Sequence, residues 1–449
     1  MTRRVDGVMN SCFKNHAERQ GAYRLLNNKR WKMDQFLDCV TANSAQCCKD
    51  LKHVLCIQDT TEFTFDNISG RLNPNDEDYG YGTNKSSEYS IFAHPCLLFD
   101  PETETPMGYS SIELYNRDRK DARQKKQLRK KLGFNEKESS RWAASAKMAN
   151  ANLPENLRKT MVGDRENDIY TVMSKTLEEG CDFLIRSIHN RLLEGDSKSK
   201  KERIIEWLDK QPVSFSCTSQ ITRQNRRKPR KALFDVKYAP VTFGNTGNGK
   251  DDVSKSISCH YVHVREDAGS VPEGEKPIEW RLLTSHEVKS KEDALRIIQW
   301  YKYRWHIEEV FRLMKTKGLG ITSAQLENGM AMKKLMAMGF YVVLKCMTLK
   351  KKYDTANESV SCNRLFTEEE CEMLHLEMEM LHKESPRSKD GNNPFREDSL
   401  AWASWIIARL GSWKAYVKSG GPPGYNTICK GLKVFHEHLT VLSFMKQKY

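Results

Sequence analysis

The order of the predicted strands and helices restricts the fold of this chain more than any other feature. Apolar, β-branched and aromatic residues predict three consecutive strands at Val54–Phe65, Tyr89–Asp100 and Met107–Asn116. Glu136–Ala151 has the pattern of an amphipathic helix, and Lys159–Ser187 predicts a strand, a turn, a helix and another strand. A core that begins in this way belongs to the α/β class.

The second half of the predicted core is interrupted by an insertion. Short alternating segments with Gly and Asn between them predict a β-rich insertion from about Asn190 to Ile278. A strand at Trp280–Ser285 follows, and then a long helix that Ser290 can cap and that Gly318 can stop. The complete order is the layout of a ribonuclease-H-like core, in which a mixed five-stranded sheet is flanked by helices.

These patterns divide the chain into five regions. We expect residues 1–50 to be helical, 51–189 to form the first part of the core, 190–279 to form the β-rich insertion, 280–320 to complete the core with its last strand and helix, and 321–449 to form a helical C-terminal region.

The charge of the chain favours a polyanionic partner. Lys and Arg number 73 against 59 Asp and Glu, a formal net charge of +14, which fits nucleic acid or an acidic membrane surface. Mean hydropathy is −0.70. The most apolar stretch, Met336–Met347, contains Lys345 and is too short to span a bilayer, and the first residues lack the apolar region of a secretory signal. We therefore expect a cytoplasmic protein with no membrane partner.

The cysteines favour reduced thiols over a disulfide framework. There are 13, an odd number, and no CxxC pair occurs, as is typical of intracellular proteins. Cys259, His260 and His263 lie close together in the sequence. Because no second pair of ligands accompanies them, a strand is favoured there over a zinc site.

One carboxylate in the last predicted core helix lies among cations. At about 100° per residue, Tyr301, Arg304, Glu308 and Lys315 fall within roughly 60° of one another on a helix. A solvent-exposed surface is one interpretation, with Glu308 paired to Arg304 and Arg312 at i±4. The alternative is that Glu308 binds Mg²⁺ while the neighbouring cations hold phosphate oxygens.

A metal site needs further carboxylates, and two aspartates follow predicted strands. Asp59 lies in the first predicted strand and Asp164 comes just after the fourth. Each also has a local interpretation, since Asp59 could form an Asx-turn and Asp164 could cap the next helix. Here the three acids fall on strand, strand and helix, in the order of elements of a ribonuclease-H-like fold.

These residues together resemble the bacterial cut-and-paste insertion-sequence transposases of the DDE type that carry the YREK signature. The signature Y, two residues, R, three, E, six, K is matched by Tyr301, Arg304, Glu308 and Lys315. "IQDTT" and "GDRENDIY" are similar to the regions of the two catalytic aspartates. "EKESSRW", "FLIRSIHNR", "EWRLLTSHEVKS", "LAWASWIIARLGSW" and "GGPPGYNT" are similar to other family segments, so the resemblance extends over nearly the whole chain.

The resemblance implies a metal-dependent polynucleotidyl transferase and endonuclease. Asp59, Asp164 and Glu308 would be the catalytic residues and would hold two Mg²⁺ ions, for which Mn²⁺ would substitute. The enzyme would nick a transposon end, form and reopen a hairpin, and join the 3′-hydroxyl to target DNA. Its partners would be double-stranded DNA and a second copy of the chain, in a bacterial cytoplasm at the nucleoid.

The resemblance also assigns residues to DNA binding. These are Tyr301, Arg304, Arg312, Lys315, Trp280, Arg186 and His189. Trp280 would receive a base removed from the stack, although a core aromatic is the alternative. Arg186 and His189 would lie near the DNA end and contact phosphate, although a structural salt bridge is the alternative for both. The basic run Arg223–Lys231 could follow a DNA backbone.

Two further segments leave alternatives open. Trp402, Trp405, Ile406 and Leu410 form an apolar helix face that could serve either dimerisation or an internal core. "ERQGAYRLLNN" resembles a segment downstream of the family's end-binding domain, and few residues precede it. Residues 1–50 are thus expected to be a remnant of that region. The alternative function is a shortened DNA-binding and dimerising regulator that inhibits transposition.

Also from the resemblance, the aromatic residues next to the signature arginine are expected to pack inside the protein. These are Tyr303 and Trp305.

Overall fold

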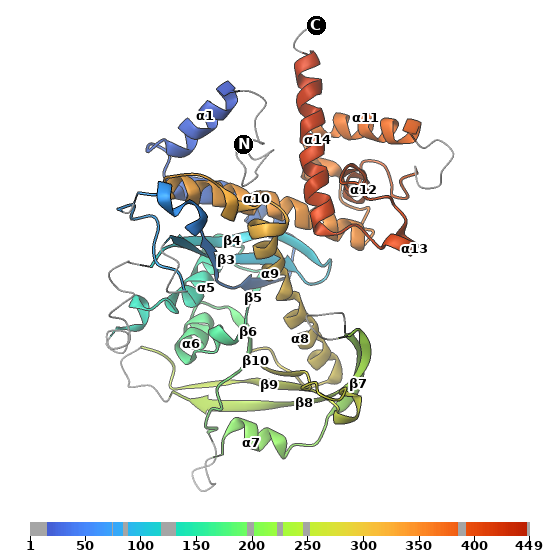
Figure 1. Cartoon of the computed structure of the whole chain (residues 1–449). Helices are drawn as coiled ribbons and strands as arrows, with labels where there is room; N and C mark the ends of the chain where they lie inside the picture. Colours follow the sequence, from blue (N-terminus) through green and yellow to red (C-terminus); the bar gives the residue numbers. More distant parts are fainter. Residues whose placement is uncertain are drawn as a thin grey trace. The chain divides into compact units, whose positions relative to one another are not determined.

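The chain forms two structural units (Figure 1). Unit 1 comprises residues 1–47, 60–124 and 307–449, and unit 2 comprises residues 48–59 and 125–306. The computed structural model describes residues 16–73, 75–83, 89–117, 132–194, 202–221, 228–245, 252–384 and 392–446. None of the helices in these ranges combines the length and the apolar character that a bilayer span requires.

Unit 2 is built on neighbouring parallel strands. These are β1 (His53–Gln58), β5 (Arg158–Gly163) and β6 (Asp182–Arg186). Their side chains are almost continuously buried, as expected for central parallel strands with both faces covered. β1 pairs with β5 in a register that sets Ile57 opposite Val162, and β5 pairs with β6. The register brings the carboxyl ends of β1 and β5 to the same edge of the sheet.

Two helices accompany these parallel strands. They are α5 (Ser140–Asn152) and α6 (Tyr170–Glu178). α6 connects β5 to β6, because parallel neighbours need a crossover connection, and α5 contacts both β1 and β5. The predicted sequence of strand, turn, helix and strand across Lys159–Ser187 is confirmed.

The predicted insertion extends the same sheet. β6 pairs with β10 (Glu279–Thr284), and the sheet continues through β9 (Ser256–Glu266), β8 (Arg230–Gly244) and β7 (Phe215–Ile221), all antiparallel. Figure 1 shows β8 and β9 as long adjacent strands, with α7 (Ile204–Asp209) in the same region. Cys259, His260 and His263 lie within β9, which confirms the strand that the sequence favours over a zinc site.

A hydrogen-bonded polar cluster lies inside unit 2. Thr160 Oγ1 lies 2.7 Å from both His53 Nε2 and His286 Nε2. His286 also lies 3.7 Å from Asp182. The His286 ring packs edge-on against Trp300 at 5.0 Å between centroids. Burial lowers the pKa of His286 to about 3, although the Asp182 carboxylate opposes the shift.

This cluster predicts a loss of stability in mild acid. The depressed pKa of His286 means that the folded state binds fewer protons than the unfolded state, so stability is complete above the unfolded pKa of about 6.5 and falls below it. The pKa of Asp182 is lowered too, but its contribution is lost only below the ordinary range of an aspartate. Between pH 7 and pH 5 we expect His286 to account for as much as about 2 kcal/mol of lost unfolding free energy.

Urea unfolding at the two pH values measures this. His286→Gln should show a smaller difference between pH 7 and pH 5, whereas His189→Gln, at an exposed position of the same unit, should behave like the parent chain. An unchanged pH dependence in His286→Gln would exclude the buried histidine as its source.

Unit 1 holds an antiparallel sheet and most of the helices. Its strands are β2 (Thr61–Thr64), β3 (Ser90–Asp100) and β4 (Thr105–Tyr115). α10 (Gly329–Asp354) contacts β4, α1 (His16–Asn27) and α2 (Met33–Thr41), and the short α3 (Ser44–Cys48) precedes β1. The single strand predicted at Val54–Phe65 is wrong in one respect: the chain forms two strands, β1 and β2, separated at Asp59 and Thr60.

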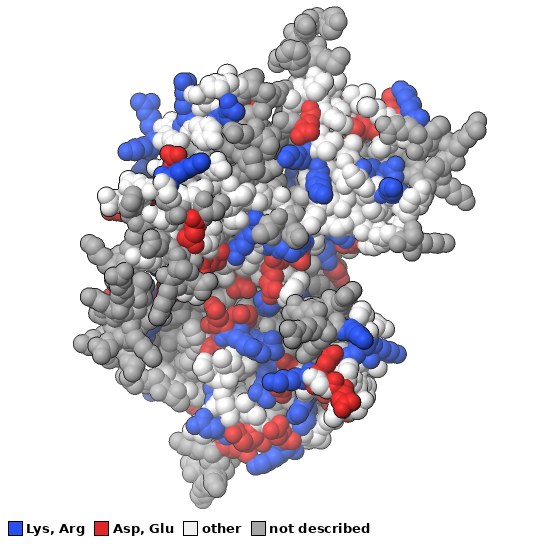
Figure 2. All heavy atoms as spheres, in the orientation of Figure 1, with Lys and Arg blue, Asp and Glu red and all other residues white. Residues whose placement is uncertain are grey.

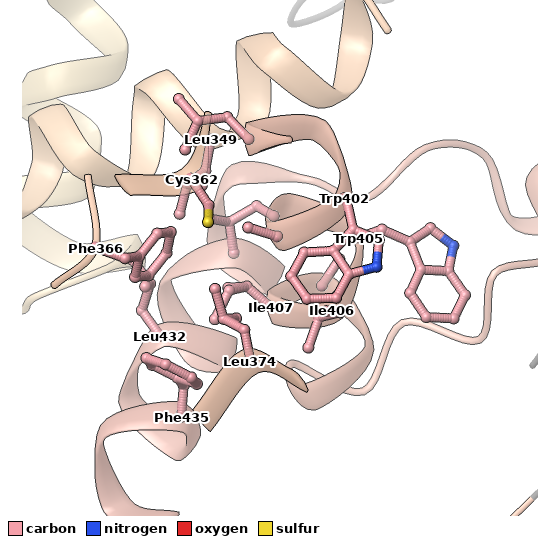
Figure 3. Packing of buried hydrophobic residues seen from close by; sticks show 14 of the residues in the cluster. Leu349, Cys362, Phe366, Leu374, Trp402, Trp405, Ile406, Ile407, Leu432 and Phe435 are labelled. Atoms are coloured by element: carbon pink, nitrogen blue, oxygen red, sulfur yellow. The ribbon is translucent and has the colours of Figure 1, made fainter. Parts of the chain in front are cut away.

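The C-terminal helices of unit 1 enclose a large apolar core. Its buried residues come mainly from α10, α11 (Glu368–Glu384), α12 (Leu400–Leu410) and α14 (Tyr425–Lys446), and the short α13 (Val417–Gly420) lies between α12 and α14 in the chain. Trp402, Trp405 and Ile406 are only 3%, 2% and 0% exposed and belong to this core (Figure 3). A Cβ atom at Gly431 would lie 1.7 Å from the Ile407 carbonyl oxygen, so glycine allows α14 to approach α12 closely. Of the two uses left open for this face, the structure supports the internal core.

The long helix predicted after Ser290 is divided. Ser290 Oγ accepts from the Asp293 backbone N–H, and Asp293 accepts in return from the Ser290 N–H, which confirms the predicted start. α8 (Lys291–Tyr303) then stops at Arg304, and α9 (Trp305–Arg312) follows. A π-helical turn completes the segment before Gly318, where an added Cβ would lie 2.7 Å from the Leu313 carbonyl oxygen.

Candidate functional site

Two aspartates directly follow neighbouring parallel strands of unit 2. Asp59 follows β1 and Asp164 follows β5, and the pairing of Ile57 with Val162 places the two aspartates at equivalent positions. Adjacent strands lie about 4.8 Å apart, so the two carboxylates can share a ligand. Asp164 Oδ1 also accepts from the Glu166 backbone N–H at 2.8 Å. The local cap considered for Asp164 therefore exists, but it uses one oxygen only.

Arg304 provides a positive charge beside the first aspartate. Arg304 Nη1 lies 3.3 Å from Asp59 Oδ2, and their side chains are 15% and 16% exposed. Arg304 therefore has a partner other than the predicted Glu308. Arg304 lies at the junction of α8 and α9 and keeps right-handed helical dihedral angles there.

Tyr301 and Trp280 form an aromatic pair near these groups. Their ring centroids lie 5.3 Å apart at an interplanar angle of 70°. Burial raises the pKa of the Tyr301 hydroxyl, the cations Arg304 and Arg186 lower it, and Asp164 raises it. The pKa of Tyr301 therefore depends on the charges of Arg304, Arg186 and Asp164, which are all predicted site residues.

Arg186 is half-buried in the same region. Its Nη2 donates to the Glu279 carbonyl oxygen at 2.8 Å. Burial lowers the pKa of its guanidinium, Tyr301 opposes this, and Arg165 and Arg304 lower the pKa further. Since Arg165 and Arg304 repel the Arg186 guanidinium, an anion placed beside it would relieve repulsion between positive charges.

A groove of about 1120 Å³ lies in unit 2 beside these residues. Its cationic lining residues are Arg186, Lys291, Arg296, Lys302 and Arg304. Within the described part of the chain, no Asp or Glu lines it. The face shown in Figure 2 carries Lys and Arg interspersed with Asp and Glu. The groove differs from that face, because its described charged lining residues are all cationic. Such a cavity selects anions.

An exposed tryptophan lines this groove, which the sequence analysis did not predict. Trp305 is 48% exposed and lines the groove, so the prediction that it packs inside is wrong. The same prediction for Tyr303, which is 7% exposed, is confirmed. The spacing of the apolar residues in α9 is the sequence signal that could have revealed this exposure. Ile307, Val310 and Phe311 form the buried face of the helix, and Trp305 does not lie on that face.

A buried aspartate links two loops of the candidate site. Asp168 Oδ2 accepts from the backbone N–H groups of Ile188 and His189 at 2.6 and 2.9 Å, and Asp168 Oδ1 lies 2.5 Å from Arg191 Nη1. Asp168 follows Asp164 by four residues, in the β5–α6 connection. It therefore fixes the segment after β6, in which the His189 side chain is exposed.

Three of the predicted site residues belong to unit 1. They are Glu308, Arg312 and Lys315. Glu308 is half-buried on α9. Arg312 Nη2 lies 2.5 Å from Glu309, and Arg312 Nη1 donates to Asn426 Oδ1 at 3.2 Å. The pairing of Arg312 with Glu308 that the sequence allows is therefore replaced by other partners.

Lys315 has an apolar and an acidic neighbour within unit 1. Its Nζ lies 5.4 Å from the centroid of the Phe63 ring. Burial lowers the pKa of Lys315, and Glu62 opposes that shift. Lys315 lies in the π-helical turn, in which the rotation of 100° per residue of an α-helix does not apply.

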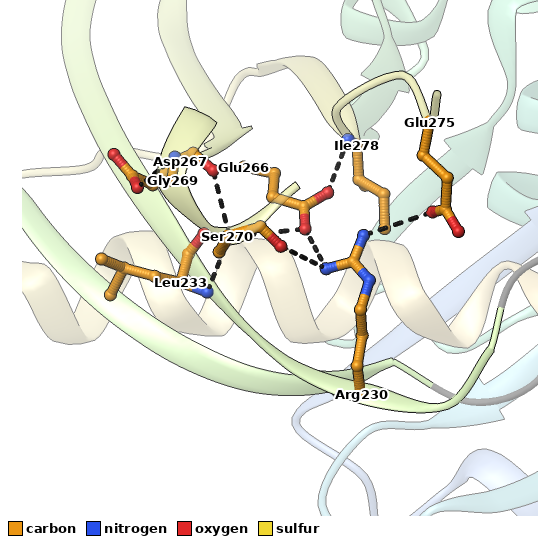
Figure 4. Close-up of polar contacts among 8 residues, drawn as sticks. All are labelled: Arg230, Leu233, Glu266, Asp267, Gly269, Ser270, Glu275 and Ile278. Atoms are coloured by element: carbon orange, nitrogen blue, oxygen red, sulfur yellow. Dashed lines mark hydrogen bonds and ion pairs between the residues drawn. The ribbon is translucent and has the colours of Figure 1, made fainter. Parts of the chain in front are cut away.

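The predicted basic run lies mostly outside the described residues. Arg223, Arg226 and Arg227 are not described. Arg230, at the start of β8, forms ion pairs with Glu266 and Glu275, and its Nη1 donates to the Ser270 carbonyl oxygen at 3.1 Å (Figure 4). The charge of Arg230 is thus used within the fold.

The donor chemistry of the two strand-end aspartates fits a hard divalent cation. Carboxylate oxygens are the protein ligands that Mg²⁺ prefers, and the neighbouring strand ends bring two of them to one place. In the described ranges, no group of three or more His, Cys, Asp or Glu residues is arranged to hold a metal ion. A third carboxylate would have to come from elsewhere.

Comparison with known families gives the class of this protein. A family model described as "Transposase DDE domain" matches residues 52–343, well over half of the 449 residues. The match contains both strand-end aspartates, Trp280 and the segment from Tyr301 to Lys315. This chain therefore belongs to the transposase DDE domain family, whose members act on DNA.

Proposed function

We propose that this transposase is a cut-and-paste enzyme of the bacterial YREK type, which cleaves transposon ends and joins them to target DNA in a Mg²⁺-dependent reaction. The observation that supports this best is the placement of Asp59 and Asp164 after neighbouring parallel strands, with Arg304 beside Asp59. The enzyme would act on DNA as a homodimer.

The proposed metal ligands are Asp59, Asp164 and Glu308. Glu308 is proposed as the third carboxylate from its spacing to Arg304 and from the family match, which includes it. Bound Mg²⁺ would make a water or a 3′-hydroxyl a stronger nucleophile and would stabilise the leaving oxygen. The fixed strand ends hold the two aspartates close together before any ligand arrives, which reduces the reorganisation needed for binding.

The proposed role of the cations is to hold the DNA end. Arg304 lies against Asp59 through a 3.3 Å contact, and it can turn its guanidinium to a phosphate oxygen when the carboxylate has another positive partner. Tyr301 can donate its hydroxyl to the same phosphate group, because its raised pKa keeps it protonated. Arg186, Lys315, Arg312 and His189 are the other proposed phosphate contacts.

The whole reaction can be tested on a plasmid. The inverted repeats that flank the encoding gene would supply the substrate. With Mg²⁺ or Mn²⁺ the purified chain should nick the plasmid at the repeats and then release hairpin ends, and EDTA should abolish both products. Metal-independent cutting, or cutting unrelated to the repeats, would contradict the proposal.

Trp280 gives a prediction that separates the steps of this reaction. Trp280→Ala should nick at nearly the parent rate but close hairpins roughly tenfold to a hundredfold more slowly, because stacking on an aromatic ring is worth about 1 to 3 kcal/mol per base and only hairpin closure needs the base outside the stack. Denaturing gels resolve nicked strands from hairpins.

The matched control for this experiment is Trp280→Phe, which keeps a ring against Tyr301. It should recover most of the hairpin rate. Equal losses of nicking and hairpin formation in Trp280→Ala would show instead that Trp280 has a structural role.

A further inference from the structure

We infer that the groove of unit 2 binds a short unpaired stretch of DNA strand, which runs from the aromatic pair Trp280 and Tyr301 along α8 toward Lys291. This inference rests on the proposed function, because it identifies the part of the DNA substrate that this groove would hold. Five observations support it.

The first observation is size. The groove measures about 1120 Å³, whereas pockets of about 300 to 1,000 Å³ are enough for a drug-sized ligand. A single base placed against Trp280 would fill only part of this volume, so the remainder has room for the nucleotides next to it.

The second observation is the face that α8 presents to the groove. Lys291, Leu295, Gln299 and Lys302 all line the groove and are exposed. Their spacing of four, four and three residues places them within about 80° of one another on a helix. The lysines at the two ends of this stripe are separated by about 16 Å along the helix axis. At 3.4 Å or more per nucleotide, that distance matches a strand of up to about five nucleotides.

The third observation is the combination of side chains. Phe234, Val264 and Ile278 give the groove apolar walls, and Trp280, Tyr301 and Trp305 add aromatic surface. Apolar and aromatic surface beneath a line of cations is how proteins bind single strands, because the bases face the protein. A duplex turns its bases inward and would leave that surface unused.

The fourth observation comes from the opposite wall, β7. It contributes Cys217, Thr218, Ser219 and Gln220. Because side chains alternate between the two faces of a strand, Cys217 and Ser219 share one face, and the Ser219 hydroxyl can hydrogen bond to sugar and phosphate oxygens without adding negative charge.

The fifth observation concerns one residue of that wall. Burial raises the pKa of the Cys217 thiol, while Lys302 and Lys291 lower it. Cys217, Lys291 and Lys302 all line the groove, so the thiol shares it with the two lysines that would hold the strand.

Cys217 offers a direct test, because a strand in the groove would cover it. The full chain would be treated with iodoacetamide, and peptide mass spectrometry would compare alkylation of Cys217 with that of Cys39, which is exposed in unit 1. A saturating 12-nucleotide single strand should slow alkylation of Cys217 about fivefold or more and leave Cys39 unchanged. A blunt duplex of the same sequence should protect much less.

Charge variants give a second readout that does not depend on cleavage. Lys291→Gln and Lys302→Gln should each weaken single-strand binding and reduce the slope of log K against log salt by about 0.7. The matched control is Lys289→Gln, because Lys289 lies two residues from Lys291, pairs with Glu287 and does not line the groove. It should leave the slope unchanged.

Several results would overturn the inference. They are unprotected Cys217 at saturating single strand, equal protection by the duplex, and an equal loss of slope in Lys289→Gln. A chain that cuts the plasmid ends but leaves Cys217 unprotected would refute the groove inference alone. A chain that protects Cys217 but never cuts would refute the proposed function and leave the groove inference standing.

Discussion

Asp59→Asn, Asp164→Asn and Glu308→Gln are each expected to lower the rate of DNA cleavage by about a thousandfold or more, which corresponds to about 4 kcal/mol of transition-state stabilisation. Each substitution keeps the shape of the side chain but removes the negative charge that a divalent cation needs from its ligand. The measurement is the initial rate of nicking on supplied end DNA with Mg²⁺, under single-turnover conditions.

Folding and a matched carboxylate serve as controls for this experiment. The far-ultraviolet circular dichroism of each variant should match that of the parent chain. Glu155→Gln is the matched control, because Glu155 is exposed and precedes the amino end of β5, whereas Asp164 follows its carboxyl end. Glu155→Gln should cleave normally. A variant at Asp59, Asp164 or Glu308 that nicks at the parent rate would remove that residue from the site.

Trp405→Ala is expected to lower the free energy of unfolding by about 3 to 5 kcal/mol, because it leaves a large cavity in a well-packed core. Trp405 is 2% exposed and packs in the C-terminal core of unit 1 (Figure 3). Urea unfolding followed by circular dichroism measures the effect.

The matched control is a substitution on the exposed side of the same helical region. Met380 of α11 is 51% exposed, so Met380→Ala should change the unfolding free energy by less than about 0.5 kcal/mol. If Trp405→Ala dissociated a dimer while each subunit kept its stability, Trp405 would belong to an interface.

The order of the core elements could be predicted from the sequence, because each is a short and strongly apolar run. β3, β6 and α6 occur within the predicted segments, and β4 and β5 overlap theirs but begin slightly earlier, at Thr105 and Arg158. The division between β1 and β2 was not predicted, because Val54–Phe65 is largely apolar or β-branched on both sides of Asp59, and the possible Asx-turn at Asp59 was the only signal of the break.

The partners of the charged residues were harder to predict. The i±4 rule pairs Arg312 with Glu308, but Arg312 contacts Glu309 and Asn426. The rule also gives no indication that Arg304 contacts Asp59, which is 245 residues away in the sequence. A rule based on helical spacing considers only residues of the same helix. It contains no information on residues that are distant in the sequence and come into contact when the chain folds.

The same limitation explains Trp305 and Asp168. The exposure of Trp305 follows from the apolar face of α9, which Ile307, Val310 and Phe311 define, and the resemblance gave no information on that face. Asp168 belongs to a run of charged residues that resembles a solvated turn, and only the fold shows that its carboxylate accepts hydrogen bonds from the segment after β6.

Iron-directed cleavage of the protein backbone tests the central claim most directly, because it locates the metal without requiring catalysis. Fe²⁺ in place of Mg²⁺, with ascorbate and peroxide, generates radicals that cut the chain close to the bound ion. We expect cuts close to residues 59, 164 and 308, suppressed by excess Mg²⁺ and absent in Asp164→Asn. Cuts confined to other regions, or an unchanged pattern in Asp164→Asn, would contradict a metal site formed by these three carboxylates.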